Sequence, residues 1–493
     1  MAHRIELRMS ASIWKGFLAD VRKRKPDETI GLMLVKPVAG INKRVYIASR
    51  LIIPSDEEAV RHQTLVKPDK DFLRAFYTWL KTDHIFELGY RVVAIHSHPF
   101  CSGSVGFSTT DHASLRADWR AIATEFDEDV EFLSMVVNQD GSCFDGYMIC
   151  SDGIQSISKI SVIDETLNVV FREEPKELLN RELYSRMLLI PDLDLGKVSK
   201  LDIGVVGLGG LGSCIVSDLA MLGIAEEGTL VLVDPDTIEV SNLSRIDYAT
   251  FDDIGRPKVD VARDYIQRAR PGRQVITFQQ KCFDREVLQA LACCDATVGG
   301  LDRVAPRSVL NDLGSNFMVP YLDAGAGVVI DQLMGREFVT SGGQVRLFVP
   351  GINPCLHCTL GLDQSAIEAE WTKMRLTDQD VETMRQTGYL QNFLAMDAPQ
   401  PSVYNLNQMV GAMTATTLLS YILSGVDYHF ASLDLEKMEI LKGTSESNKL
   451  CPYCGEDNCI GNAELFDLEK HLAPVPFEDI PIPGDSRHIV EIQ

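Results

Sequence analysis

Two histidines and a carboxylate have the spacing of a metal site. His96 and His98 end an apolar run in the sequence Ala-Ile-His-Ser-His-Pro, and Asp111 follows at the start of an expected helix. In a strand, alternate side chains share a face, so both imidazoles can point at one ion. Two imidazoles, one carboxylate and a water form the open tetrahedral site typical of catalytic zinc. Glu28, just before another apolar run, can act as a general base.

Together these residues resemble the JAMM motif of the MPN/JAB metallopeptidases, which is a distant Glu followed by His-Ser-His-Pro and then Ser-x-x-Asp. Nine residues separate His98 from Ser108, more than the family usually has, which predicts a longer and flexible loop. Family members hydrolyse peptide or isopeptide bonds after the C-terminal glycine of ubiquitin-like proteins. The resemblance implies a base, three zinc ligands and an oxyanion-stabilising serine, namely Glu28; His96, His98 and Asp111; and Ser108.

A His-x-His pair alone is equally consistent with two histidines at the surface or at the edge of the core. The proline after His98, the preceding Glu28 and the Ser-x-x-Asp element together favour the metal site. Cys101 could bind metal or respond to oxidants, but we interpret it as a loop residue. His112, which adjoins Asp111, is interpreted as a residue of the helix surface.

A glycine-rich turn further along the chain has the pattern of a phosphate-binding loop. The apolar run 203–206 predicts a buried strand, and a helix over 213–222 follows the turn Gly-Leu-Gly-Gly-Leu-Gly. Glycine lets the backbone approach phosphate closely, and a helix N-terminus favours negative charge. The next expected strand ends at Asp234, 22 residues after the last glycine, where an acid can meet a ribose hydroxyl. Dehydrogenases that bind NAD share this pattern. The glycines expected to approach phosphate are Gly207, Gly209, Gly210 and Gly212.

The residues after this strand favour ATP over NAD. The run 233–245, Val-Asp-Pro-Asp-Thr-Ile-Glu-Val-Ser-Asn-Leu-Ser-Arg, and then Gly-Arg-Pro-Lys258 resemble the ThiF/MoeB/ubiquitin-activating superfamily. Activation of a carboxylate with ATP places negative charge on the α-phosphate and on the departing pyrophosphate, which Arg245 and Lys258 can stabilise. The resemblance further implies that Asn242 contacts ATP and that Asp302 binds Mg²⁺.

An arginine before the glycine-rich turn implies a second subunit. Arg186 closes the element Leu-Tyr-Ser-Arg, and in the superfamily the arginine of this element reaches the ATP of the partner subunit. The resemblance therefore implies a homodimer in which Arg186 acts across the interface. The alternative is an ordinary solvated arginine.

Two Cys-x-x-Cys clips are separated by 92 residues. Four thiolates in two such turns make a closed structural zinc site, and the adenylating superfamily commonly carries paired clips. A lone clip could be a redox pair, but the presence of the second clip favours zinc. The four expected ligands are Cys355, Cys358, Cys451 and Cys454.

The step after adenylation stays open. Many members of the superfamily transfer the activated carboxylate to a cysteine between the clips, but none lies between Thr359 and Leu450. Transfer is then either direct from the acyl-adenylate or through a nucleophile elsewhere, for which Cys459 is a candidate. An oxyester on Ser365 or Ser402 would require activation of a hydroxyl that is ordinarily a poor nucleophile.

Length and composition limit the class of protein. The chain has 493 residues, enough for two or three domains, and a formal net charge of -23. It contains no apolar run near the roughly 20 residues of a membrane helix, no basic patch for nucleic acid and no secretory signal. Twelve cysteines in a chain of this size favour a reducing compartment over a disulfide framework, so we expect a cytoplasmic protein.

The expected fold is α/β in two parts. Short β-rich runs alternate with helical runs such as 69–81, which predicts a mixed α/β MPN/JAB domain over residues 1–155. A linker is expected over 156–178. A Rossmann-like adenylating domain with a mostly parallel sheet and the four-cysteine zinc site is expected over 179–460. An acidic, proline-containing tail is expected over 461–493.

The leading hypothesis is a bifunctional enzyme of a prokaryotic ubiquitin-like pathway. A zinc-dependent peptidase or isopeptidase acts at the C-terminal glycine of a ubiquitin-like protein, and the adenylating module couples that carboxylate to AMP for conjugation, with antiviral defence as one setting. A neighbouring conjugating enzyme would favour this hypothesis, whereas a sulfurtransferase would favour sulfur-carrier activation for cofactor biosynthesis. A non-catalytic scaffold that binds ubiquitin-like proteins is the third hypothesis, and the intact site residues count against it.

Overall fold

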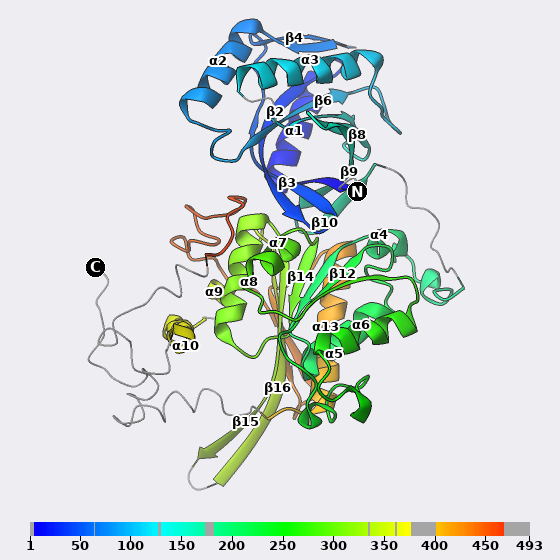
Figure 1. Ribbon diagram of the computed structural model, residues 1–493, viewed down its shortest axis with the longest axis vertical. Coiled ribbons are helices and arrows are strands. Elements are labelled where there is room, and N and C mark those ends of the chain that lie inside the picture. The colour runs from blue at the N-terminus through cyan, green and yellow to red at the C-terminus, as the bar shows by residue number, and fades with distance from the viewer. Residues whose placement is uncertain are drawn as a thin grey trace, which may run out of the picture.

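The computed structural model describes residues 4–63, 65–126, 130–172, 182–333, 336–359, 362–375 and 401–467, with the backbone alone for 329–333 and 336–340. These residues form two eight-stranded sheets with helices packed on both, so the expected α/β class is confirmed. Figure 1 shows the N-terminal sheet above the second sheet, with the two in contact. No helix within these ranges is long and apolar enough to span a membrane.

The N-terminal sheet closes on itself. Its order is β1-β3-β2-β6-β7-β8-β9-β10, and β1 also pairs with β9. The hairpin of β4 and β5 forms a small separate sheet. The strands are β1 (Arg4–Ser10), β2 (Ile30–Gly40), β3 (Lys43–Ile52), β4 (Ala59–His62), β5 (Leu65–Pro68), β6 (Arg91–His98), β7 (Phe132–Asn138), β8 (Phe144–Cys150), β9 (Gly153–Ile163) and β10 (Leu167–Phe171).

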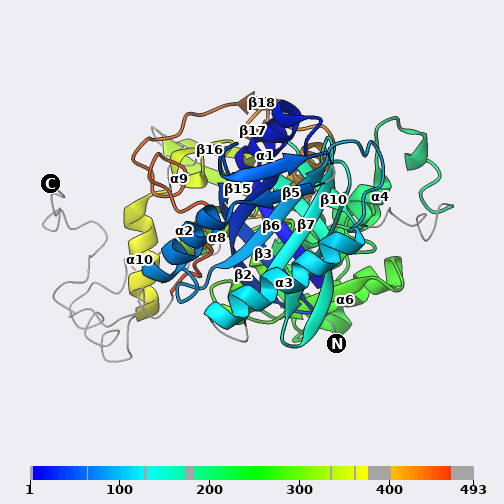
Figure 2. The ribbon, with the colours of Figure 1, turned by 90° about the horizontal axis from the view of Figure 1, so that it is seen from above.

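Alternation along these strands sorts the apolar side chains onto two faces. Leu32 and Val92 belong to the cluster under α2 and α3, whereas their chain neighbours Met33 and Val93 belong to the cluster around α1. Figure 2 shows α2 and α3 crossing in front of the sheet. The helices are α1 (Ala11–Arg24), α2 (Lys70–Thr82) and α3 (Thr109–Glu125).

The structure corrects the expected linker over 156–178. Most of its first part forms β9 and β10, which belong to the N-terminal sheet. Within it the Lys159 side chain is buried, because it faces the second domain. Residues 173–178 lie outside the described ranges.

The second sheet has the order β13-β12-β11-β14-β15-β16-β17-β18. The first five strands in that order are parallel, as expected, and the last three are antiparallel. The chain order reverses at β11, and α/β sheets bind ligands at the carboxyl end of such a switch point. The strands are β11 (Ile203–Val206), β12 (Thr229–Val233), β13 (Gln274–Phe278), β14 (Ala296–Gly299), β15 (Tyr321–Leu333), β16 (Arg336–Phe348), β17 (Phe430–Asp434) and β18 (Glu439–Gly443).

Helices flank this sheet in two groups. One group is α5, α6 and α13, and the other is α7, α8 and α10, and Figure 1 shows them on different sides of the strands. Because helices cover both faces of the sheet, the sequences of its parallel strands are continuous apolar runs. The helices are α4 (Leu195–Ser199), α5 (Gly210–Met221), α6 (Lys258–Ala269), α7 (Arg285–Ala292), α8 (Val304–Phe317), α9 (Leu356–Thr359), α10 (Gln364–Arg375) and α13 (Tyr404–Leu423).

An arginine of β1 joins the two domains. Arg8 is 1% exposed and donates to the carbonyl oxygens of Ala292 and Phe317, both at 2.9 Å. These carbonyls end α7 and α8. The guanidinium therefore satisfies the acceptors of both helix C-termini and complements their negative dipole ends.

A buried ionic network surrounds this contact. Lys159 Nζ lies 2.8 Å from both carboxylate oxygens of Asp295, and Lys43 Nζ lies 2.6 Å from Asp202 Oδ2. The two aspartates directly precede β14 and β11, so the N-terminal domain contacts the amino ends of the parallel strands. The network contains three cations and three anions, namely Arg4, Lys43 and Lys159; and Glu6, Asp202 and Asp295.

The beginning of the expected tail packs against the second domain. Gly461 N donates to Ser315 O at 3.0 Å, and the rings of Phe466 and Trp371 stack at 5.5 Å. Residues 461–467 are therefore part of the fold. The remainder of the tail lies outside the described ranges.

Candidate active sites

The two histidines end β6 on the face that α3 covers. Because side chains alternate, His96 and His98 continue the face of Val92. Glu28 lies two residues before the start of β2. It is an even number of residues from Leu32, so it continues the same face. Since β2 and β6 are neighbours, the strand pattern brings the expected base to the expected ligands.

The donor atoms of the expected zinc site lie close together. His96 Nε2 lies 3.2 Å from Asp111 Oδ1. His98 Nε2 lies 3.8 Å from Asp111 Oδ2 and 3.9 Å from Glu28 Oε1. One donor atom from each of the two histidines and the aspartate lies within 4.8 Å of the others. Two imidazole nitrogens and a carboxylate oxygen at these separations fit a zinc ion with one open position.

The surroundings of these groups shift their pKa values. Burial raises the pKa of Glu28 to about 7, with the charge of Asp111 adding to the rise and His96 opposing it. Burial alone would raise the pKa of Asp111, but His96 and the hydrogen bonds with Ser108 lower it well below its ordinary range. A carboxyl group with a pKa near neutrality can both accept and return a proton, which suits a general base.

Ser108 fixes the aspartate at the first turn of α3. Ser108 Oγ accepts from Asp111 N at 3.2 Å, and Ser108 N donates to Asp111 Oδ2 at 2.7 Å. This reciprocal capping box satisfies two amides at the helix N-terminus. Ser108 thus lies beside the ligand set, and its contact with an oxyanion stays a prediction.

Glycine is sterically required in the phosphate loop. Gly207 has a φ of +84°, and a Cβ there would lie 2.7 Å from Gly300 O. A Cβ on Gly212 would lie 1.8 Å from Gly207 O. Gly209 instead faces open space and forms the N-cap of α5, so the positive end of this helix is free to meet phosphate.

Asp234 holds the loop and a lysine together. Its Oδ2 accepts from Leu208 N at 2.6 Å, and its Oδ1 accepts from Asp236 N at 2.9 Å. Lys258 Nζ lies 2.7 Å from Asp236 Oδ2 and 3.7 Å from Asp234 Oδ1. Burial raises the pKa of Asp234, while Lys258 and the two amides oppose the rise. These contacts fix the lysine beside the glycine turn, and the ribose contact of Asp234 stays a prediction.

Arg245 and a residue that the sequence did not indicate form a wall of the loop. A Cβ on Gly210 would lie 2.5 Å from Asn407 Nδ2 and 2.8 Å from Arg245 Cδ. Arg245 also donates to Ser241 O at 3.1 Å, while the buried Asn242 accepts from a neighbouring amide through its Oδ1. Asn407 belongs to α13, and only the packing of α13 against α5 brings it to the loop.

Two further expected residues lie in exposed positions. Asp302 follows the carboxyl end of β14, beside the glycine turn, and Arg307 Nε fixes its loop by donating to Leu301 O at 3.1 Å. Arg186 is exposed just before a short 3-10 helix. Their roles toward Mg²⁺ and toward a second subunit stay predictions.

The fold brings the two cysteine clips together. Cys355 Sγ lies 3.5 Å from Cys451 Sγ. Cys358 Sγ lies 3.6 Å from Cys454 Sγ, and the four sulfurs lie within 4.8 Å of one another. Four thiols at this spacing fit a closed tetrahedral zinc site, which is an arrangement that stabilises a fold.

Cys459, considered above as a nucleophile, is poorly suited to that role. Its Sγ accepts from Asn316 Nδ2 at 3.6 Å, and burial raises its pKa to about 11. Because the thiolate is the reactive form, little of this cysteine is nucleophilic at neutral pH.

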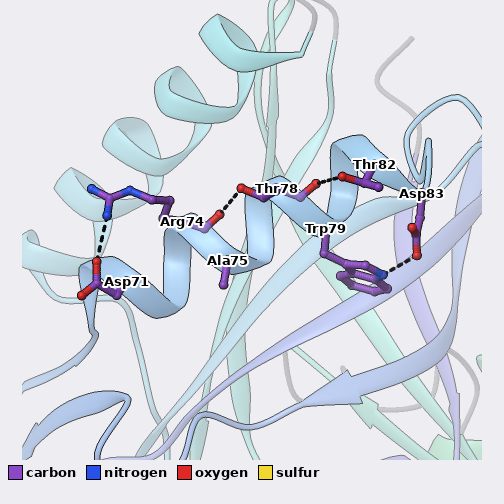
Figure 3. A pocket seen from close by; sticks show the side chains of 7 residues that line it. All are labelled: Asp71, Arg74, Ala75, Thr78, Trp79, Thr82 and Asp83. Carbon is purple, nitrogen blue, oxygen red and sulfur yellow. Dashed lines mark hydrogen bonds and ion pairs between the residues drawn. The ribbon is translucent and has the colours of Figure 1, made fainter.

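A shallow pocket on the N-terminal domain carries none of these groups. Figure 3 shows that its lining side chains lie along α2 and the residue that follows it, from Asp71 to Asp83. Trp79 Nε1 donates to Asp83 Oδ2 at 2.6 Å, and Arg74 pairs with Asp71. Since its polar groups bond to one another along a single helix, we assign no site there.

Comparison with known proteins identifies the class of the second domain. The model of the ThiF family matches residues 184–453, more than half of the chain, and the chain belongs to this family. The match includes the glycine loop, the lysine and arginine beside it and the first cysteine clip, and it ends one residue before Cys454 of the second clip.

Individual relatives match over shorter stretches. Sulfur carrier protein ThiS adenylyltransferase of Escherichia coli is 34% identical over 31% of this chain and 60% of its own length. The NEDD8-activating enzyme E1 catalytic subunit of Saccharomyces cerevisiae is 32% identical over 32% of this chain and 50% of its own. The chain thus spans about half of the length of these relatives. The solved structure of E. coli MccB has a TM-score of 0.43 and 20% identity, covering 58% of this chain and 75% of that one.

Proposed function

We propose that this chain uses ATP to activate the C-terminal carboxylate of a ubiquitin-like protein that ends in glycine. The observation that carries the proposal is the cluster of phosphate loop, Arg245 and Lys258 at the switch point of a ThiF-family domain. In this role the loop amides and the N-terminus of α5 bind phosphate, and the two cations stabilise charge on the α-phosphate and the leaving pyrophosphate. Mg²⁺ at Asp302 would neutralise phosphate charge.

The same proposal gives the N-terminal domain a metallopeptidase activity of the JAMM type. It is supported by the convergence of His96, His98 and Asp111 with the buried Glu28. A zinc ion held by the three ligands would polarise the scissile carbonyl. Glu28 accepts a proton from the attacking water and returns it to the leaving amine, a role that its position 3.9 Å from His98 Nε2 supports. Ser108 would donate to the oxyanion.

We place the peptidase domain within residues 4–172 and the adenylating domain within 182–467, the second stabilised by zinc at the four cysteines. Arg186 is proposed to act in a second subunit of a homodimer. The product of activation passes either to a conjugating enzyme or, as a second candidate, to a sulfur donor. The similarity to a sulfur-carrier adenylyltransferase and the missing cysteine between the clips favour that second route.

ATP–pyrophosphate exchange tests the adenylating activity. Candidate ubiquitin-like proteins with a free terminal glycine should drive exchange by the full-length protein, and Lys258→Ala should abolish it. Lys437→Ala is the matched control because this lysine also pairs with an aspartate, Asp434 at 2.6 Å, but lies exposed on the far edge of the sheet. Absence of exchange with every cognate partner would refute the adenylating activity.

Cleavage of a ubiquitin-like precursor with a C-terminal extension tests the peptidase activity. Glu28→Gln should abolish cleavage while the protein keeps its zinc, because the amide cannot accept the proton. Glu165→Gln, an exposed carboxylate of the same domain, serves as control. Undiminished cleavage by the Glu28 variant would remove this residue as the base.

A further inference from the structure

The loop that joins His98 to α3 is held by groups far from it in the sequence. Asn138 Nδ2 donates to Gly103 O at 3.4 Å, and Phe107 N donates to Asp145 Oδ2 at 3.0 Å. Phe107 is the residue directly before Ser108, so Asp145 fixes the backbone where the capping box begins. These contacts hold the loop from outside its own sequence.

A single arginine connects this anchor to the end of β10. Arg172 Nε donates to Asp145 Oδ1 at 2.7 Å, and Arg172 Nη2 donates to Tyr147 OH at 2.7 Å. The guanidinium also lies 4.8 Å from the centre of the Tyr147 ring. Asp145 is mostly buried, and two of its partners, Arg172 and the Phe107 amide, occupy different oxygens.

The two partners of Arg172, Asp145 and Tyr147, both contact Phe107. The Tyr147 ring lies 5.1 Å from the rings of Phe107 and of His112. Phe107 in turn lies 6.1 Å from the imidazole of His96. The pair of Arg172 and Asp145 therefore supports one ligand through ring packing and the helix that carries Asp111 through the backbone.

The arginine is itself anchored near the other domain. Arg172 N donates to Ser158 O at 3.0 Å, and the next residue along β9 is Lys159, which binds Asp295 of the adenylating domain. Residues 173–181, which connect the two domains, begin directly after Arg172. The support for the loop therefore rests on the strand that docks the domains together.

We propose that Arg172 and Asp145 are positioning residues that hold the His98–Asp111 loop in the geometry required to bind the metal. This inference rests on the proposed peptidase function. Neither residue touches the donor atoms in the contacts described, so each acts through Phe107. Such supporting contacts orient ligands, and their loss typically lowers metal affinity or activity about tenfold to a hundredfold.

Cobalt titration of the metal-free, full-length protein tests the inference. The part of the visible d–d absorption that His96→Ala removes reports on the histidine site, and the thiolate charge-transfer bands of the four cysteines serve as an internal control. Arg172→Ala and Asp145→Asn should weaken cobalt binding at the histidine site about tenfold and leave the thiolate bands unchanged. The cobalt affinity of Arg172→Lys should lie between those of the natural protein and Arg172→Ala, because lysine keeps the charge but loses the planar donors.

Kinetics on an extended ubiquitin-like precursor supply the second readout. The same variants should lower kcat and leave KM unchanged, since the pair does not contact the substrate tail. Lys15→Ala, which breaks the 2.6 Å pair with Asp164 on the same domain, should change neither quantity.

Each outcome decides between the inference and the function on which it rests. Unchanged cobalt affinity in Arg172→Ala and Asp145→Asn would overturn the positioning role alone. Absence of any His96-dependent absorption in the natural protein would overturn the metal site and the positioning role together. If the natural protein binds cobalt there but cleaves nothing, the peptidase function falls while the cobalt affinities still decide the positioning role. Loss of the folded N-terminal domain in all three variants, Arg172→Lys included, would show a structural role instead.

Discussion

Removal of Lys159 is the most direct perturbation of the contact between the domains. Its Nζ lies 2.8 Å from both oxygens of Asp295 and 3.0 Å from Glu6 Oε2, and all three side chains are almost wholly buried. Lys159→Met keeps the apolar stem but leaves three carboxylates facing two cations. The variant therefore isolates the charge of the network from its packing.

The expected loss follows from the burial of the remaining charge. Removal of one partner of a buried ion pair costs about 3–5 kcal/mol because the other charge is left without compensation. Asp295 keeps neutral donors nearby, Asp202 N at 2.8 Å and Ser161 Oγ at 3.3 Å. The double variant Lys159→Met with Asp295→Asn restores the charge balance and keeps an acceptor for the amide, so it should recover most of the loss.

The deficit should depend on pH in one direction. Burial alone would raise the pKa values of Asp202 and Asp295, but the surrounding cations, Lys43 and Lys159 foremost, lower both. Groups with a lowered folded pKa contribute stability above their unfolded pKa of about 3.9 and lose it as the pH falls through the folded value. Without Lys159 the two folded pKa values rise. The free-energy deficit should therefore be largest near neutral pH and shrink as acidification protonates the unpaired carboxylate.

Denaturant unfolding of the full chain measures these differences. Tryptophan fluorescence follows mainly the N-terminal domain, which holds three of the four tryptophans. Lys15→Met breaks the exposed pair with Asp164 and should change the free energy of unfolding little, because solvent screens the pair. A loss for Lys159→Met as small as that of this control, or one that does not shrink as the pH is lowered from neutral to about 3, would refute the assignment of the cost to buried charge.

Three further predictions concern the adenylating domain. Gly210→Ala places a Cβ 2.5 Å from the Asn407 amide and 2.8 Å from Arg245 Cδ, so these two side chains must shift and exchange should fall on the order of a hundredfold, measured as ATP–pyrophosphate exchange. Cys454→Ser should release one zinc per chain by metal analysis and lower the unfolding midpoint, whereas Cys459→Ser should retain the metal; equal zinc content in the two would contradict the four-cysteine site. Mixing Arg186→Ala with Lys258→Ala subunits should restore up to about a quarter of the exchange activity, because half of the random dimers hold one intact site; no recovery after subunit exchange would count against a shared site.

The sequence was sufficient for the parts of the sites that local geometry determines. The alternation of a strand alone places His96 and His98 on one face, and the capping pattern alone places Asp111 in the first turn of α3. The glycine turn is equally local, because Gly207 and Gly212 face each other across a few residues. In these cases the spacing of residues along one element contains the three-dimensional arrangement.

Residues whose partners are distant in the chain could not be found in this way. Asn407 reaches the glycine turn only because α13 packs on α5. Asp145 and Arg172 appear in the sequence as ordinary polar residues. Only the fold shows that they contact each other and that Asp145 contacts a loop some forty residues earlier in the chain. The linker expected over 156–178 was wrong for the same reason, since the buried partner of Lys159 belongs to the other domain.

The docking of the two domains determines how their proposed activities can be related. The N-terminal domain contacts Asp202 and Asp295, which precede β11 and β14, whereas Gly207 and Asp302 follow the same two strands. At about 3.3 Å per residue, the four residues of β11 separate these two ends by about 13 Å. The sheet of the adenylating domain therefore lies between its glycine loop and the N-terminal domain. Under the proposed function, a carboxylate released by cleavage would have to leave the N-terminal domain and approach the glycine turn from the other end of the sheet.

This arrangement predicts that the two activities are separable within the intact chain. Glu28→Gln should leave ATP–pyrophosphate exchange unchanged when the ubiquitin-like protein already ends in glycine, because that tail never needs the peptidase site. With the extended precursor the same variant should show no exchange, since the carboxylate is not yet exposed. Adding a catalytic amount of a Lys258→Ala protein, which retains the peptidase, should then restore exchange in trans. If the Glu28 variant lost exchange with the mature partner as well, the two sites would have to communicate directly, and the buried network through Lys159 would be the contact to examine.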